Sequence, residues 1–304
     1  MKNIETSIRP QLQNKAKNTG RIFMEVLQYY AIERFLYRLS ISKYSDFFIL
    51  KGALIFQALQ IKERRTTLDI DFLAYFENEI KKSEKIIKDI CMVNVNKDDG
   101  LVFDADSVIG ERIKEGAEYE GIRIKFKGFL GKSRIPMQID IGFGDIISPR
   151  AETIEYPAIL DFPKSKLKGY SLESIIAEKF ESMVKLGAIN SRMKDFYDIW
   201  MLSRQFDFKG EKLTRALKRT FTHRGTKFPK TQKLFTEEFY NDTSDRQIMW
   251  KSFLSKNNID SAPEKLSIIV NGIEKFLTKP VKAILSDKKL SYFWSASGTW
   301  EISD

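Results

Sequence analysis

The 304-residue sequence contains one cysteine, Cys91, and one histidine, His223. A single cysteine excludes a disulfide framework and a cysteine-based zinc site, and a single histidine excludes a histidine-rich metal site. There is no run of 18 uninterrupted apolar residues, and the first twenty residues lack the apolar core of a signal peptide. We therefore expect a soluble, cytoplasmic protein without a membrane partner, whose acid–base or metal chemistry depends on Asp, Glu and Lys.

The composition is that of a globular protein with an uneven positive charge. Hydrophobic residues make up 42% of the chain and charged residues 30%, which excludes global disorder, and the length suggests two domains. Residues 1–160 carry 25 basic and 23 acidic residues, a net charge of +2, whereas residues 161–304 carry 26 and 18, a net charge of +8. The charge of +10 therefore lies mainly in the second half.

The densest basic stretch runs from Glu211 to Lys230, with seven basic residues and one acidic residue. Such an excess can attract a polyanion through salt-sensitive phosphate contacts, or it can be the solvated face of a helix. Both interpretations stay open at this point. If the stretch binds RNA, the expected contacts are Lys212, Arg215, Lys218, Arg219, Arg224 and Lys227.

The pattern of apolar residues predicts an α/β domain, an extended connector and a helical domain. Helical spacing recurs at 21–39 and 77–92, and residues 101–144 contain alternating segments typical of strands. Pro149, Pro157 and Pro163 mark the connector, because proline fixes φ and removes a backbone donor. Beyond it we expect helices at 172–186, 193–205, 212–221, 244–255 and 266–277. The predicted domains are residues 1–165 and 166–304.

Two carboxylates close together on one strand are the first candidate site. In the segment Leu68-Asp69-Ile70-Asp71-Phe72 the aspartates alternate with apolar residues, so a strand would direct both carboxylates to one face. Their mutual repulsion would be relieved by a divalent cation such as Mg²⁺ or Mn²⁺, for which oxygen ligands are suitable. A solvated strand face is the alternative.

Two further segments support a phosphate-related site. An apolar run ends at Lys51-Gly52-Ala53, where glycine would let backbone N–H groups approach a phosphate. Residues 137–143 alternate strictly and direct Asp140 away from the apolar face. If the two strands are neighbours, Asp140 lies beside Asp69 and Asp71, and three carboxylates can hold two metal ions. An ordinary polar residue on a strand is the alternative for Asp140.

The order of these segments resembles the nucleotidyltransferases of the polymerase-β-like superfamily, and within them the AbiEii/AbiGii abortive-infection toxins of type IV toxin–antitoxin systems. The matching segments are Gly20–Ser40, Leu50–Gly52, Arg65-x-Thr67-x-Asp69-Ile70-Asp71, Ile139–Asp145, Ala177-Glu178-Lys179 and Asn190–Trp200. The resemblance implies a nucleotidyltransferase fold, with a mixed sheet followed by a helical bundle. The chain departs from the family at Ala53, because the family usually has Gly and often Ser or Thr after the first glycine.

The resemblance also implies roles in the second domain. Lys179 would be the active-site lysine that binds the β- and γ-phosphates, Asp195 would orient Lys179 or the nucleotide, and Asp198 would support it. From the residues alone, Lys179 can also be a boundary lysine with its ammonium in water. Asp195 and Asp198 can equally lie on a surface helix, with Asp198 paired to Lys194. Arg65 and Thr67 flank the carboxylates and are expected to contact the nucleotide, although Arg65 can instead pair with Asp69.

The function expected first is metal-dependent transfer of a nucleoside monophosphate from an NTP to an acceptor hydroxyl. By resemblance, the acceptor is RNA, with the 3′ end of tRNA favoured, and a cognate antitoxin is a further partner. The second hypothesis is a nucleic-acid- or partner-binding protein that has lost efficient catalysis, as the alanine at position 53 suggests. The third is an enzyme that modifies a small hydroxylated molecule such as an antibiotic, against which the basic charge argues.

Overall fold

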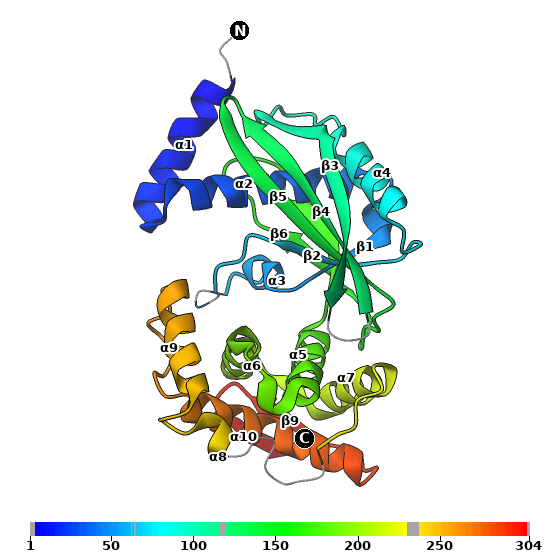
Figure 1. Cartoon of the computed structure of the whole chain (residues 1–304), viewed down its shortest axis with the longest axis vertical. Coiled ribbons are helices and arrows are strands. Elements are labelled where there is room, and N and C mark those ends of the chain that lie inside the picture. The colour runs from blue at the N-terminus through cyan, green and yellow to red at the C-terminus, as the bar shows by residue number, and fades with distance from the viewer. Residues whose placement is uncertain (1–3, 62, 64, 116–118, 230–236, 303–304) are drawn as a thin grey trace. The chain divides into compact units, whose positions relative to one another are not determined.

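The computed structural model describes residues 4–61, 63, 65–115, 119–229 and 237–302 and divides the chain into two compact units (Figure 1). Unit 1 comprises Met1–Ile61, Thr66–Gly144 and Glu152–Gly169, and unit 2 comprises Lys62–Arg65, Asp145–Ala151 and Tyr170–Asp304. The predicted fold class, a mixed sheet followed by a helical domain, is confirmed. The units interleave, because two short segments before Tyr170 belong to unit 2.

The described strands of unit 1 form a seven-stranded mixed sheet in the order β3-β4-β5-β2-β1-β7-β6. The pairs β1–β7 and β2–β5 are parallel, and the other neighbours are antiparallel. The strands are β1 (Phe48–Lys51), β2 (Ile70–Ala74), β3 (Leu101–Glu115), β4 (Tyr119–Leu130), β5 (Ser133–Phe143), β6 (Glu152–Tyr156) and β7 (Ser165–Gly169).

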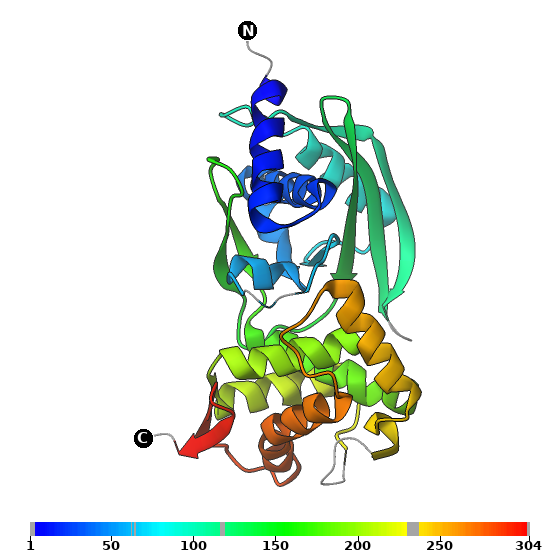
Figure 2. The same cartoon turned by 90° about the vertical axis from the view of Figure 1, so that its left-hand side faces the viewer.

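Helices pack on this sheet through apolar residues at helical spacing. The helices are α1 (Ile4–Thr19), α2 (Phe23–Ile41), the 3₁₀ turn η1 (Ser45–Phe47), α3 (Leu54–Ala58) and α4 (Ile80–Cys91). Most of α2 is buried between α1 and the sheet, and Figure 2 shows α1 crossing in front of it. Cys91 is buried in α4, and burial raises the pKa of its thiol to about 12.

The proline-marked segment differs from the predicted connector, because it contains two strands of the sheet. β6 and β7 pair with each other, and β7 also pairs with β1 inside the sheet. Pro149 precedes β6, and Pro157 and Pro163 lie between the two strands, so none of these three prolines occupies a ladder position in β6 or β7. The three prolines therefore lie outside β6 and β7 and do not interrupt their pairing.

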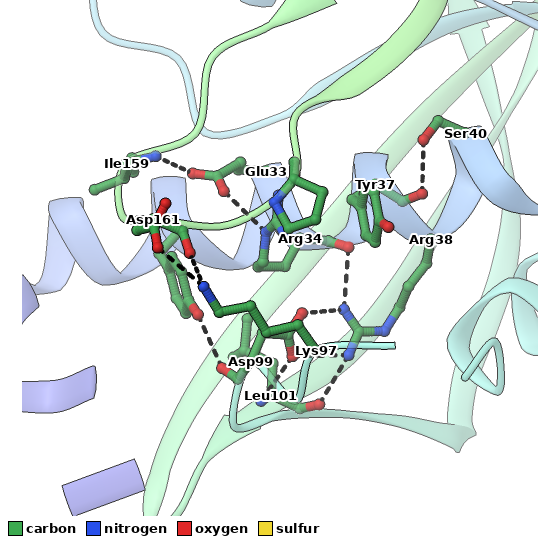
Figure 3. Close-up of polar contacts among 12 residues, drawn as sticks. Glu33, Arg34, Tyr37, Arg38, Ser40, Lys97, Asp99, Leu101, Ile159 and Asp161 are labelled. Atoms are coloured by element: carbon green, nitrogen blue, oxygen red, sulfur yellow. Dashed lines mark hydrogen bonds and ion pairs between the residues drawn. The ribbon is translucent and has the colours of Figure 1, made fainter. Parts of the chain in front are cut away.

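A polar cluster beneath α2 holds the loop between β6 and β7 (Figure 3). The buried Glu33 accepts a hydrogen bond of 2.6 Å from the backbone N–H of Ile159 and lies 2.8 Å from Nε of Arg34. Arg34 donates to the carbonyl of Pro163, and Arg38 donates through two nitrogen atoms to Asp99, at 2.7 and 2.9 Å. The contacts to Ile159 and Pro163 hold the loop between β6 and β7 against α2, and those of Arg38 hold Asp99, which lies just before β3.

Unit 2 is built from helices and a small sheet. Its elements are α5 (Leu172–Leu186), η2 (Gly187–Ile189), α6 (Met193–Gln205), β8 (Phe208–Lys209), α7 (Gly210–His223), α8 (Glu237–Tyr240), α9 (Asp245–Asn257), α10 (Leu266–Leu285), β9 (Tyr292–Ser295) and β10 (Thr299–Ile302). α5 and α6 have the predicted bounds to the residue, and α7 and α9 agree within two residues, whereas α10 continues beyond the predicted end at 277 and α8 was not predicted. None of the described helices is long and apolar enough to cross a membrane.

The sheet of unit 2, in the order β10-β9-β8, is a feature that the sequence analysis did not predict. Gly210 makes it possible, because a Cβ there would lie 2.5 Å from the carbonyl oxygen of Tyr292. Trp294 and Trp300 pack against Phe276 of α10, with ring centroids 4.9 and 6.2 Å away. The sheet therefore closes the apolar face of α10.

Candidate active site

In unit 1, four charged residues lie in one row across four neighbouring strands. Lys51 on β1 pairs with Asp71 on β2, Asp71 pairs with Asp140 on β5, and Asp140 pairs with Arg123 on β4. Residues that are directly opposite on neighbouring strands share one face of the sheet. The strands of Asp71 and Asp140 are neighbours, which is the condition under which the sequence places Asp140 beside Asp71. Asp69 lies in a bend directly before β2 and is exposed.

The turn after β1 requires glycine. Gly52 has φ = +71°, a conformation that L side chains rarely adopt, and a Cβ at this position would overlap the carboxylate of Asp71. The Asp71 side chain therefore lies directly against the backbone of Gly52. Ala53 follows and precedes α3, so the backbone of the predicted phosphate-binding turn is adjacent to one of the predicted metal ligands. Thr67, in the same unit, donates its backbone N–H to the hydroxyl of Tyr29 at 3.1 Å.

Asp140 is engaged by Arg123 through both carboxylate oxygens. Nε of Arg123 donates to Oδ1 at 2.8 Å, and Nη2 donates to Oδ2 at 2.7 Å. The hydrogen bonds to Asp140 raise the pKa of Arg123, and the charges of Asp69 and Glu111 add to this effect. A bidentate pair of this kind is among the stronger polar contacts in proteins. The sequence analysis did not anticipate it.

The donor chemistry of this row fits a magnesium or manganese ion, because carboxylate oxygens are the ligands these cations prefer. Among the residues that the structure describes, however, no group of three or more Asp, Glu, His or Cys side chains converges on a point where it could hold a metal. The set of Asp69, Asp71 and Asp140 as joint metal ligands therefore stays a prediction.

In unit 2, Lys179 on α5 is held by two aspartates of α6. Its Nζ lies 2.8 Å from Oδ1 of Asp195 and 2.7 Å from Oδ2 of Asp198, and both carboxylates are buried. Burial by itself would lower the pKa of Lys179, but the two carboxylates outweigh it and raise the pKa. Burial by itself would raise the pKa of Asp195, but the charges of Lys179 and Arg192 outweigh it and lower the pKa of that carboxyl. Both groups are therefore charged at neutral pH.

More positive charge surrounds the same aspartates. Nε of Arg65 donates to Asp198 at 3.2 Å, and Nε of Arg192 lies 2.9 Å from Oδ2 of Asp195. Lys194 follows on α6, where its side chain is exposed. The cluster of Lys179, Arg65, Arg192, Lys194, Asp195 and Asp198 has a net charge of +2, which favours an anion such as a phosphate.

Within unit 2, the segment that carries Arg65 is fixed to α6. The hydroxyl of Tyr197 donates to the backbone carbonyl of Glu63, and the amide of Gln205 donates to the carboxylate of Glu63 at 3.1 Å. The sequence analysis left open whether Arg65 pairs with Asp69, and the structure gives it Asp198 as a partner. Arg192 is a further member of the cluster that was not predicted. Its position three residues before Asp195 on a helix would have indicated the contact.

The basic stretch separates into exposed and buried residues. Lys212, Arg215, Lys218, Arg219 and Lys227 are exposed, as is His223, whereas Lys230 lies outside the described residues. The prediction for Arg224 needs correction, because its side chain is only 14% exposed. Arg224 lies 2.8 Å from Asp145 and 2.9 Å from Glu181, so this guanidinium is committed inside unit 2.

Comparison with known proteins supplies a family. A family profile described as "Nucleotidyl transferase AbiEii toxin, Type IV TA system" matches residues 34–277. A search of curated proteins gave no match. Among solved structures, a Helicobacter pylori protein described as a candidate nucleotidyltransferase aligns with a TM-score of 0.45 and 11% identity over 83% of this chain and 93% of that one. JHP933 from Helicobacter pylori aligns with a TM-score of 0.43 and 12% identity over 84% and 92%.

Proposed function

Because the chain belongs to the AbiEii family of nucleotidyltransferase toxins of type IV toxin–antitoxin systems, we propose that it transfers a nucleoside monophosphate from an NTP to an acceptor hydroxyl with the help of Mg²⁺ or Mn²⁺. The hydroxyl oxygen attacks the α-phosphorus, the bond to the β-phosphate oxygen breaks, and pyrophosphate leaves with its electron pair. The hydroxyl proton passes to a base or to water. The observation that carries the proposal is Lys179, a nearly buried cation that two aspartates keep charged and fix in place.

The residues of unit 1 are assigned to the metal and the reacting phosphate. Asp69 and Asp71 would hold the cation, which supplies charge neutralisation along the triphosphate. The side chain of Lys51 and the backbone of Gly52 and Ala53 would bind phosphate oxygens beside Asp71. Thr67 would contact the nucleotide close to Asp69. The contact between Gly52 and the Asp71 carboxylate supports this arrangement, because it brings the turn and the predicted ligand together.

The residues of unit 2 are assigned to the leaving group. Lys179 and Arg65 would stabilise the negative charge that develops on pyrophosphate, which is the main electrostatic requirement of this reaction. Asp195 and Asp198 would position the two cations and contact no phosphate themselves. The net positive charge of the cluster supports this assignment.

The proposed acceptor is RNA, with the 3′ end of tRNA favoured. Support comes from α7 and the residues after it, where five cations, namely Lys212, Arg215, Lys218, Arg219 and Lys227, are exposed to solvent. Family membership implies an NTP substrate and an antitoxin partner. The outcome of the modification would be arrested translation.

A second candidate function is RNA or partner binding without efficient transfer. Ala53, which offers no hydroxyl to a phosphate, favours it, and so does the commitment of Asp140 to Arg123. A small-molecule acceptor is disfavoured by the exposed cations of α7, because cationic antibiotics need acidic pockets.

The decisive experiment incubates the purified chain with Mg²⁺, total tRNA and each α-labelled NTP in turn. Label should enter RNA with the intact chain and not with Asp71→Asn, which keeps the size of the side chain and removes its charge. Asp106→Asn, an exposed aspartate of β3, is the matched control and should transfer label normally. Tight RNA binding without transfer of any nucleotide would overturn the proposal in favour of the binding protein.

A further inference from the structure

The contact between Arg123 and Asp140 has consequences for the number of metal ions that the row can hold. Both residues belong to interior strands of the sheet, and their positions opposite each other are set by the backbone ladder between β4 and β5. The Asp140 side chain is 12% exposed and that of Arg123 is 32% exposed. Neither side chain has to extend far into solvent to make this contact. The guanidinium therefore stays beside the carboxylates of the row.

The charges of the row nearly cancel without any metal. Lys51 and Arg123 contribute two positive charges, and Asp69, Asp71 and Asp140 contribute three negative charges. The four residues of the row have no net charge together, and Asp69, directly before β2, changes the total to −1. One divalent cation changes the total to +1 and two would change it to +3, so a second ion would add its charge to surroundings that are already positive.

The position of Arg123 determines which carboxylate is unavailable as a metal ligand. Each oxygen of Asp140 accepts one N–H of Arg123 and keeps a further lone pair, so the hydrogen bonds alone do not prevent metal binding. The obstacle is the charge of the guanidinium, because a cation bound to Asp140 would lie against it in partly buried surroundings. Repulsion between the two cations means that either Arg123 or a metal ion occupies Asp140.

We propose that Arg123 is the resident counter-cation of Asp140 and thereby limits this carboxylate row to a single divalent cation, held by Asp69 and Asp71. The inference rests on the proposed metal-dependent function and makes Arg123 a residue that sets the metal stoichiometry. It departs from the expectation that Asp140 completes a second metal site. The absence of any three converging acidic side chains among the described residues agrees with it.

The test is a titration of the full chain with Mn²⁺ alone, in which electron paramagnetic resonance measures the free ion. The wild type should bind one Mn²⁺ per chain. Arg123→Met, which keeps the apolar stem and removes the charge, should bind a second ion at least tenfold more tightly than the wild type does. The double variant Arg123→Met/Asp140→Asn should return to one ion. Equal stoichiometry and affinity in the wild type and Arg123→Met would overturn the inference.

Two further variants make the result specific. Lys125→Met removes a cation from the same strand, where Lys125 pairs with Glu111 at 2.6 Å, and it should titrate like the wild type. Arg123→Lys keeps one charge without the two-pronged contact and should give an intermediate affinity for the second ion; it also serves if Arg123→Met does not fold. Failure of the proposed metal-dependent function would give a different result from failure of this inference. In that case Asp71→Asn would bind the first Mn²⁺ as the wild type does, because Asp71 would not be one of its ligands.

Discussion

Lys179 and Asp198 form an ion pair of 2.7 Å in which the carboxylate is fully buried and the lysine side chain is 13% exposed. The same lysine holds Asp195 at 2.8 Å, so one ammonium serves two buried carboxylates on one helix. A charge in these surroundings costs free energy unless it is paired. The cluster is thus stable as a whole and sensitive to the loss of any single member.

Replacing Lys179 with methionine should lower both stability and activity. The two carboxylates would keep Arg65 and Arg192 but lose their shared partner, and we expect the free energy of unfolding to fall by about 3 kcal/mol. Nucleotidyl transfer should fall at least about 100-fold, because the leaving pyrophosphate loses a positive charge. Urea denaturation and the labelling assay measure the two effects. Lys185→Met, an exposed position on the same helix, is the control, and equal losses in both variants would contradict the prediction.

Overexpression of the chain should arrest growth, and Asp71→Ala should abolish this arrest while the protein stays folded. The reason is that the variant loses a proposed metal ligand, whereas its position on β2 keeps all backbone pairs with β1 and β5. Growth curves and circular dichroism of the purified variant provide the measurement. Asp106→Ala, exposed on β3, should remain toxic. Toxicity that persists in a folded Asp71→Ala variant would exclude the metal role of this residue.

Gly52→Ala should reduce activity far more than Gly20→Ala, although both replacements place alanine at a positive φ. The new Cβ overlaps the Asp71 carboxylate, and the positive φ adds roughly 1–2 kcal/mol of strain. Gly20 has φ = +67° with nothing within 4 Å of a Cβ, so Gly20→Ala has the strain without the overlap. Thermal unfolding should show similar losses for both, and the transfer rate should fall only for Gly52→Ala. Equal rates in the two variants would show that Asp71 tolerates displacement.

The exposed cations of α7 should govern RNA affinity and its dependence on salt. The triple variant Lys212→Gln/Arg215→Gln/Arg219→Gln removes three potential phosphate contacts, and the slope of log K against log salt should become shallower by up to about 2. Binding of labelled tRNA at several salt concentrations measures this slope. Lys81→Gln/Lys85→Gln/Lys251→Gln removes the same charge from exposed positions elsewhere. Equal slopes for the two triple variants would indicate general attraction without a binding face on α7.

Much of this arrangement follows from local sequence patterns. The bounds of α5 follow from its apolar spacing and from Ser171, whose side chain accepts a hydrogen bond from the backbone N–H of Ser174. The strands that carry Asp71 and Asp140 follow from two alternating segments that each need a buried face. Such features depend on residues close in sequence, so one chain suffices to predict them.

The remaining features depend on contacts between distant residues. Arg123 and Asp140 are 17 positions apart and meet because the tight turn at Gly131-Lys132 sets the register of β4 and β5, which the alternation within either strand does not show. Arg224 belongs to the basic stretch by sequence but lies just after the end of α7, where the chain turns it toward Asp145 and Glu181. The small sheet of unit 2 begins with β8, which has only two residues and gives no alternation to detect. Charge and burial at these positions are therefore properties of the tertiary structure.

Glu33 should make the stability of the chain decrease as the pH rises from about 5 to 8. Burial raises the pKa of this carboxyl from 4.5 to about 7, against the opposing charge of Arg34. Between these values the unfolded chain has released the proton that the folded chain still holds, so rising pH favours unfolding, and the effect is complete above pH 7. A difference of this size corresponds to at most about 3 kcal/mol.

The measurement compares the free energy of unfolding of the wild type and Glu33→Gln at pH 5, 6, 7 and 8. Glutamine cannot ionise, so the wild type should lose stability relative to the variant over this interval, whatever the variant's own stability is at pH 5. Glu25→Gln, on the same helix and partly exposed, controls for the removal of one carboxyl group. A difference between the wild type and Glu33→Gln that is constant from pH 5 to 8 would show that Glu33 ionises equally in the folded and unfolded chain.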